Sequence, residues 1–345
     1  MNQKQKSKPD IVDVAKAAGV SISTVSRSFN HPDLLKPATR KKIDRAVQKL
    51  GYIRNRAAQV MHGRRTGTIG LVVPTIDNAI FAELIQSFSE ALDQLGFTML
   101  IVSHGFDLDR EYAMLRKLLE HRVDGLAVIG LEHSEATYQL IEQQAIPSVA
   151  IWNYETDARL SCVGVQNSEA GRLAARHLLD LGHRDIALIF PDPDGNDRAR
   201  DRLQGASDTF QQDQIAIPDD WRLEAPYNIA DAKQASLTLL SGPQRPTAIL
   251  CGNDIIAQGV LYAALQLGLH VPDDLSIMGI GDFKGSGEIE PSLSTIRIPA
   301  RRIGTLAAEQ IIKTVTGETE GTTATNCELR LVQRASTSSP RSTTP

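Results

Sequence analysis

The chain has 345 residues, of which 41% are hydrophobic and 23% charged, and this composition argues against disordered and fibrous classes. The net charge of −4 conceals a division: residues 1–65 carry 15 Lys and Arg against 4 Asp, a balance of +11, whereas the remainder carries 22 basic and 37 acidic groups, a balance of −15. The three cysteines lack metal-ligand spacing, no run of about 18 apolar residues occurs, and the first ten residues lack a secretory signal, so we predict a cytoplasmic protein with no metal, cofactor or membrane partner.

Residues 11–30, IVDVAKAAGVSISTVSRSFN, have the spacing of a helix-turn-helix. Ala15 is small enough for two helices to cross closely, and Gly19 suits the left-handed conformation of the turn. Ser21 and Ser23 are both candidate N-caps of the second helix. Four apolar residues are placed to bury against one another, namely Ile11, Val14, Val20 and Val25. A plain helical hairpin is the alternative, but the basic flanks favour DNA binding.

We expect the second helix to read bases in the major groove, where all four base pairs can be distinguished. Its polar face offers Ser23, Thr24, Ser26 and Arg27 to the groove. Ile22 suits contact with a thymine methyl group. Arg27 suits either a bidentate contact with guanine or a plain phosphate contact, and we favour the guanine contact.

A third helix is predicted to begin at Pro37, because proline suits the first helical position, and to end at Gly51. Residues 1–53 therefore form a DNA-binding head. Residues 54–66 follow as a short, basic, amphipathic linker.

From residue 67 onward, short apolar strands alternate with amphipathic helices in two successive rounds. This alternation predicts an α/β fold with doubly wound parallel sheets in two lobes. We expect a core at 67–334, with lobe 1 at about 67–162 and 297–332 and lobe 2 at about 163–296. Residues 335–345 are small and polar, which predicts a disordered tail.

A series of motifs follows in a fixed order, namely DVAKAAGVSISTVSR, LGYIRNRAAQVM, TGTIGLVVP, AGRLAARHLLDLGHRDIALI, RLQG, CGND with LGLHVPDDLSIMGIGD, and PSLSTIRIP. On these motifs the chain resembles the lac repressor family of bacterial transcription regulators, from Ile11 to about Arg334. The resemblance implies a helix-turn-helix head, a hinge that folds on the operator, and a two-lobed sugar-binding core of the periplasmic-binding-protein type. The stretch IFAELIQSFSEALDQLGFTMLI looks closest to the gluconate-repressor branch, whose ligands are sugar acids.

For the head, the resemblance implies that Ile22 and Ser23 choose bases and that Arg27 adds a base contact. Phosphate contacts are implied for the polar residues of the same helix, and the DNA-binding set of the head is Ser21, Ile22, Ser23, Thr24, Ser26, Arg27 and Asn30.

For the hinge, the resemblance implies a helix from Asn55 to about His62 that contacts DNA through Asn55, Ala58 and Met61. Met61 stands at the position of an apolar wedge in the minor groove, where Leu is usual. Arg54 stands where proline is usual. An ordinary linker is the alternative interpretation of this segment.

Ligands of open parallel sheets bind beyond the carboxyl ends of the strands, and several polar and aromatic residues fall there. The predicted effector-binding residues are Asn78, Phe81, Trp152, Asn153, Asn167, Arg198, Arg202, Asn253, Asp254 and Asp282. Aromatic rings suit the apolar face of a sugar, and the arginines suit hydroxyls or a carboxylate. The resemblance places Arg202 at the effector, and it shows Gly281 where an acid usually receives sugar hydroxyls.

Several of these residues have structural alternatives. Asn253 and Asp254 suit the cap of the helix that follows, and Trp152 suits the core. His104, which follows the second strand, is interpreted as a loop histidine rather than a ligand.

The sequence therefore predicts a transcription regulator of the repressor type that binds a pseudo-palindromic operator in double-stranded DNA. A small sugar or sugar acid is the expected effector, and a homodimer is expected because no leucine heptads follow residue 334. An enzyme of Rossmann type is the first alternative, but GIGDFKGSG does not form the GxGxxG pattern that opens a helix. A transport-type sugar-binding protein is the second, and it requires an export signal. We expect no enzymatic activity.

Overall fold

The computed structural model describes residues 8–53, 65–77 and 79–341. They belong to two compact units, one that ends at Thr66 and one that begins at Gly67. The predicted contacts of Asn55, Ala58, Met61 and Asn78 lie outside the described residues. Within the described ranges, no helix is long and apolar enough to span a membrane.

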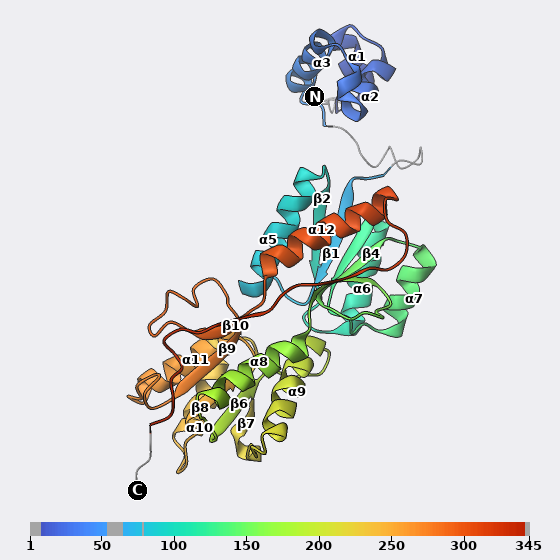
Figure 1. Ribbon diagram of the computed structural model, residues 1–345. Coiled ribbons are helices and arrows are strands. Elements are labelled where there is room, and N and C mark those ends of the chain that lie inside the picture. Colours follow the sequence, from blue (N-terminus) through green and yellow to red (C-terminus); the bar gives the residue numbers. More distant parts are fainter. Residues whose placement is uncertain (1–7, 54–64, 78, 342–345) are drawn as a thin grey trace, which may run out of the picture. The chain divides into compact units, whose positions relative to one another are not determined.

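The first unit contains the predicted helix-turn-helix and a third helix (Figure 1). Its elements are α1 (Ile11–Ala18), α2 (Ile22–Asn30), the 3-10 turn η1 (Pro32–Leu34) and α3 (Pro37–Leu50). Gly19 ends α1 with φ of 65°, and Pro37 opens α3, as predicted. Val14, Val25 and Ile43 are fully buried where the three helices meet. The head is therefore held by a small apolar core of its own.

Lobe 1 of the second unit is built on a parallel sheet with strand order β11-β5-β4-β3-β1-β2. The strands are β1 (Thr68–Val73), β2 (Thr98–Ser103), β3 (Gly125–Ile129), β4 (Ser148–Asn153), β5 (Ser161–Val165) and β11 (Ala324–Asn326). Helices α5 (Ala79–Gln94) and α12 (Ala300–Thr316) pack on one face, and α6 (Leu108–Glu120) and α7 (Glu135–Gln144) pack on the other. Successive side chains of β1 alternate between the faces, so Leu71 joins the first layer and Val72 the second.

Lobe 2 repeats this arrangement with strand order β12-β10-β9-β8-β6-β7. Its strands are β6 (Ile186–Phe190), β7 (Arg222–Glu224), β8 (Ala248–Cys251), β9 (Ser276–Gly281), β10 (Ser294–Arg297) and β12 (Arg330–Val332). Its helices are α8 (Asn167–Asp180), α9 (Asp197–Gln212), α10 (Ile229–Leu240) and α11 (Asp254–Gln266), with the 3-10 turn η2 (Asp219–Trp221). Only β12 runs antiparallel to its neighbour, β10, in this sheet. The predicted two-lobed α/β architecture is confirmed.

The lobe boundaries differ from those predicted at two places. Strand β5, Ser161–Val165, lies wholly in the sheet of lobe 1, although lobe 2 was expected to begin at about residue 163. Strand β12, Arg330–Val332, pairs with β10 in lobe 2, although the segment up to residue 332 was expected in lobe 1. The chain crosses between lobes within a few residues after β11, and a run as short as CELRLV does not reveal such a crossing.

The expectation of a disordered tail is wrong for the described part of residues 335–345. Ser336 is fully buried, and its hydroxyl donates to the carbonyl of Ile277 and accepts from the amide of Ser294, at 2.6 and 2.8 Å. Thr337 Oγ1 lies 2.8 Å from Ser294 Oγ and 2.9 Å from His177 Nε2. Small hydroxyl side chains order this segment because they bond to the strands of lobe 2, and composition alone does not show these partners.

Replacing Ser336 with Ala is expected to lower the free energy of unfolding by about 1–3 kcal/mol, because it leaves a buried amide and a buried carbonyl without their partner. Chemical denaturation of the full chain measures this loss. Ser339→Ala, at an exposed position in the same segment, is the matched control and should leave the stability unchanged. Equal stability of the two variants would contradict the ordered tail.

Candidate DNA-binding helix and effector cleft

Helix α2 presents the predicted DNA-contacting residues at its start. Ser21 caps the helix by accepting from the amide of Thr24, and its hydroxyl also lies 2.8 Å from Ser23 Oγ and 2.7 Å from Thr24 Oγ1. Ser21 and not Ser23 is therefore the cap. These bonds fix the first turn of α2 before any DNA is bound.

The exposed side of α2 carries Ile22, Ser23 and Arg27, and Ile22 remains 47% exposed although it is apolar. Thr24 and Ser26 are half-buried beside them. Asn30 closes the helix, and its side chain is not among the described ones. Fully buried Val25 anchors the opposite side of α2 against the other helices. The arrangement leaves a short, uncharged turn and one guanidinium free to enter a groove.

A small pocket lies between the lobes of the second unit, at the carboxyl ends of the strands. Its wall is formed by Phe81, Phe106, Trp152, Asn196, Arg198, Arg202, Tyr227, Asn253 and Phe283. The pocket has a volume of about 20 Å³, which is room for about one water molecule. An outer pocket of about 500 Å³ shares Phe106, Asn196 and Tyr227 with it. The cleft between the lobes is thus narrow at its inner end and wide at its outer end.

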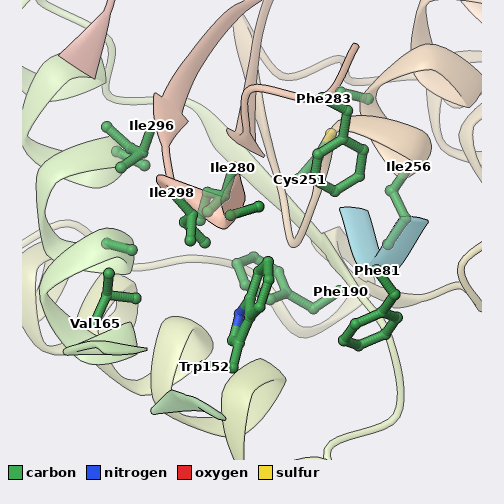
Figure 2. Packing of buried hydrophobic residues seen from close by; sticks show 14 of the residues in the cluster. Phe81, Trp152, Val165, Phe190, Cys251, Ile256, Ile280, Phe283, Ile296 and Ile298 are labelled. Atoms are coloured by element: carbon green, nitrogen blue, oxygen red, sulfur yellow. The ribbon is translucent and has the colours of Figure 1, made fainter. Parts of the chain in front are cut away.

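Aromatic rings from both lobes form much of this wall. Phe81 and Trp152 of lobe 1 pack with ring centroids 5.7 Å apart, and Phe106 of lobe 1 lies 6.0 Å from Tyr227 of lobe 2. Figure 2 shows Trp152 beside Phe81, in a cluster that also contains Phe283. Such rings can cover the apolar face of a small cyclic ligand.

Trp152 has a strained backbone, with φ of 90°, and its side chain is only 1% exposed. A Cβ atom on the neighbouring Gly164 would lie 2.2 Å from the Trp152 carbonyl carbon, so glycine is required there. Strain of this kind persists where the surrounding structure holds it, and it concentrates at functional sites. Trp152 is therefore both a core residue and part of the pocket wall, which joins the two interpretations of its sequence position.

Arg202 is the most deeply buried cation of the pocket, with 3% of its surface exposed. It donates from Nε to Asn167 Oδ1 at 2.9 Å and from Nη1 to the carbonyl of Gly252 at 3.2 Å. Both acceptors are neutral. Burial lowers the pKa of the Arg202 guanidinium below its ordinary value, because the charged form loses hydration without a bonded carboxylate.

A chain of side-chain hydrogen bonds leads from Arg202 to the other lobe. Asn167 Nδ2 donates to Asn153 Oδ1 at 3.4 Å, and Asn153 Nδ2 donates to Asp197 Oδ2 at 3.0 Å. Asn153 and Asn167 therefore lie behind the pocket wall and orient the charged groups. Arg198 takes a place in the wall itself.

Asn253 lines the pocket and also caps α11, since its side chain accepts from the amide of Ile256 at 2.9 Å. The two interpretations of Asn253 therefore describe the same residue. His104 is buried in its loop, with Nδ1 lying 3.2 Å from the carbonyl of Asp107, and it is not part of the pocket wall.

The predicted effector contacts of Asp254 and Asp282 need correction, because neither lines the pocket. Asp254 is fully buried in lobe 2 and accepts from the amide of Phe283 and the hydroxyls of Ser286 and Thr295. Asp282 pairs with two arginines, Arg297 and Arg334. The oxygens of both carboxylates are thus bonded within their own lobe.

Four wall residues were not predicted from the sequence, namely Phe106, Asn196, Tyr227 and Phe283. Phe106 lies two residues beyond His104, and Phe283 directly follows Asp282, so adjacency to predicted positions was the available signal. Tyr227 follows β7, a strand of only three residues. Asn196 caps α9 and donates to Tyr227 Oη at 3.1 Å.

The sequence matches two protein families. Residues 10–55 match the family described as bacterial regulatory proteins, lacI family, and residues 175–337 match the periplasmic binding protein-like domain. The HTH-type transcriptional repressor PurR of Salmonella arizonae is 32% identical over 328 residues, which cover 94% of this chain and 96% of that protein.

Solved structures agree with this match. The lac repressor dimer bound to operator and the anti-inducer ONPF is similar with a TM-score of 0.84 and 26% identity, covering 96% of this chain and 99% of that one. The transcription regulator GntR from Chromobacterium violaceum has a TM-score of 0.74 and 29% identity, covering 78% of this chain and 99% of that one. With its helix-turn-helix head and two-lobed core, the chain belongs to the lacI family of bacterial transcription regulators.

Proposed function

We propose that this protein is a sequence-specific repressor whose affinity for operator DNA is controlled by a small sugar or sugar acid bound between the lobes of the core. The observation that carries the effector part is the pocket itself, in which the buried guanidinium of Arg202 faces aromatic walls from both lobes. The relatives act as regulators, so we assign a cytoplasmic role in DNA binding and no enzymatic role.

The DNA part rests on the exposed residues of α2 and on the basic head. One recognition helix buries only a modest interface, so a single head is too small to specify one operator. Two heads on a pseudo-palindromic site supply the missing contacts, and this requires a homodimer. The lac repressor structure is likewise a dimer on its operator.

The effector part rests on charge and shape. Among the described residues, the acceptors bonded to Arg202 are neutral, and a buried cation of this kind is stabilised by an anionic partner with good hydrogen-bond geometry. The rings of Trp152 and Phe81 suit the C–H face of a sugar ring or chain. A sugar acid combines both features, because its carboxylate complements the arginine and its carbon skeleton complements the rings.

Effector binding is coupled to the arrangement of the lobes, because residues of both lobes form the pocket wall. An effector therefore favours the arrangement of the lobes that fits it best. If that arrangement changes operator affinity by some factor, the operator must change effector affinity by the same factor.

A gel-shift assay on DNA upstream of neighbouring genes, with a panel of sugars and sugar acids added, tests the proposal. We expect the logarithm of the association constant to fall linearly with the logarithm of the salt concentration, with a slope of about −0.9 per neutralised phosphate. We also expect at least one sugar acid to release the protein from DNA. Binding that no compound of the panel alters would contradict control by this class of effector. Lack of any DNA binding would contradict the regulator itself.

Replacing Arg27 with Ala is expected to relax preference at one base pair of each half-site by about 1–3 kcal/mol, because a bidentate guanine contact is lost. Titrations against operators that carry each base at every position measure this change. Arg40→Ala, which removes an exposed guanidinium from α3, is the matched control and should weaken all operators alike. Uniform weakening by Arg27→Ala would show a phosphate contact instead.

Replacing Arg202 with Gln is expected to abolish release by the effector while operator binding persists, because the amide lacks the charge that holds a carboxylate. The shift assay with the active compound measures this, and circular dichroism checks that the variant is folded. Arg176→Gln, at an exposed ion pair of α8, should respond like the parent protein. An unchanged response of Arg202→Gln would place the effector elsewhere.

A further inference from the structure

Asp197 begins helix α9 of lobe 2, yet its carboxylate binds groups of lobe 1. Oδ2 accepts from the amides of Leu131 and Glu132, at 2.7 and 3.1 Å, and from Asn153 Nδ2 at 3.0 Å. The first two donors belong to the segment after β3, residues 130–134, which we call the β3–α7 loop. All three donors come from lobe 1, so this carboxylate joins the lobes directly.

The other oxygen of Asp197 holds a pocket residue. Oδ1 accepts from the backbone amide and from Nη1 of Arg198, both at 2.8 Å, and the same Nη1 donates to the carbonyl of Ile129 in lobe 1 at 3.4 Å. Burial raises the pKa of the Asp197 carboxyl, but the Arg198 charge and the backbone amides outweigh it and hold the pKa below its ordinary value. Asp197 is therefore ionised near neutral pH.

The β3–α7 loop is shaped to receive these two side chains. Gly130 has φ of 89°, and a Cβ atom there would lie 2.3 Å from Arg198 Nη1 and 2.9 Å from Asp197 Oδ1. From within lobe 1, His133 bonds through Nε2 to the Gly130 carbonyl at 3.1 Å and through Nδ1 to buried Glu111 at 2.9 Å. The loop is thus rigid on the lobe 1 side and fits closely to lobe 2.

An ordinary capping role does not explain Asp197. The cap of α9 is Asn196, whose side chain accepts from the amide of Ala199, so the helix start has its own acceptor. Asp197 instead uses its two oxygens for five donors, three of them in the other lobe. Separation of the lobes would therefore cost this carboxylate three of its five hydrogen bonds.

We propose that Asp197 is a positioning residue that favours the closed arrangement of the lobes and holds Arg198 at the pocket wall. Opening of the cleft must break the contact with the β3–α7 loop, so Asp197 raises the population of the closed arrangement. This inference rests on the proposed role of the cleft, and it adds the residue that sets how readily the cleft opens.

The test follows exposure of Trp152 in the full chain without effector. The chain has two tryptophans, and Trp221→Phe, made in every variant, leaves Trp152 as the sole fluorophore. In the parent we expect weak quenching by iodide, because Trp152 is 1% exposed. Asp197→Asn should raise the quenching constant several-fold, because an amide has a single acceptor oxygen and its NH2 group cannot accept from the remaining donors, so the cleft opens.

The matched control is Asp213→Asn, which removes the same charge from the residue that ends α9 and breaks an ion pair with Arg176 inside lobe 2. Its quenching should equal that of the parent. A purely structural role of Asp197 would lower the thermal stability of Asp197→Asn without exposing Trp152. Gly130→Ala provides a second route from the lobe 1 side, because its Cβ displaces Arg198, and it should reproduce the effect of Asp197→Asn.

Two results would overturn the proposal: unchanged quenching in a folded Asp197→Asn or Gly130→Ala variant, or a parent whose Trp152 is already as accessible as in the urea-unfolded chain. The parent measurement decides the matter if both variants fail to fold. Operator binding of the parent in the shift assay is independent of this outcome. Failure of the closure mechanism is therefore distinguishable from failure of the proposed function.

Discussion

Two buried guanidinium groups, those of Arg198 and Arg202, stand between the lobes, and among the described residues the carboxylate of Asp197 is the only one bonded to either of them. Arg198 is paired with it, and Arg202 reaches it only through Asn167 and Asn153. In a site of low dielectric this arrangement has a surplus of positive charge. The proposed anionic effector follows from that imbalance, since these two buried guanidinium groups share one bonded carboxylate among the described residues.

The course of the chain through the lobes explains how a change in the cleft can reach the DNA. Lobe 1 begins at Gly67, and Asp124 Oδ2 accepts from the amides of Gly67 and Thr68 at 2.6 and 3.3 Å. The first residue of the core, Gly67, is therefore hydrogen-bonded to a residue that directly precedes strand β3 of lobe 1. In the proposed mechanism, rotation of lobe 1 against lobe 2 displaces this first residue of the core, to which the preceding segment is joined.

Local patterns predicted the parts of the structure that depend on neighbours in the sequence. Gly19 and Ser21 specify the turn and cap of the head, and alternating strands and helices specify the two lobes, because these features arise from backbone conformation and periodicity. Contacts between distant segments were not predicted. Asp254 was expected in the pocket but bonds within lobe 2, and Tyr227 lines the pocket although it was not predicted there. The bonding partners of a buried carboxylate, and the position of a residue after a three-residue strand, depend on how the sheet packs and not on neighbours in the sequence.

Gly281 stands where related regulators usually have an acid, and the backbone and packing at this position explain the glycine. Gly281 has φ of 139°, and a Cβ atom there would lie 2.0 Å from the ring of Phe283, so a side chain in place of this glycine is strained and requires Phe283 to move. The adjacent carboxylate, Asp282, is bonded to Arg297 and Arg334. Phe283, which lines the pocket, therefore presents an aromatic ring beside Gly281. A ligand that meets this wall gains from apolar surface and negative charge rather than from many donated hydroxyls, which favours an acid over a neutral sugar.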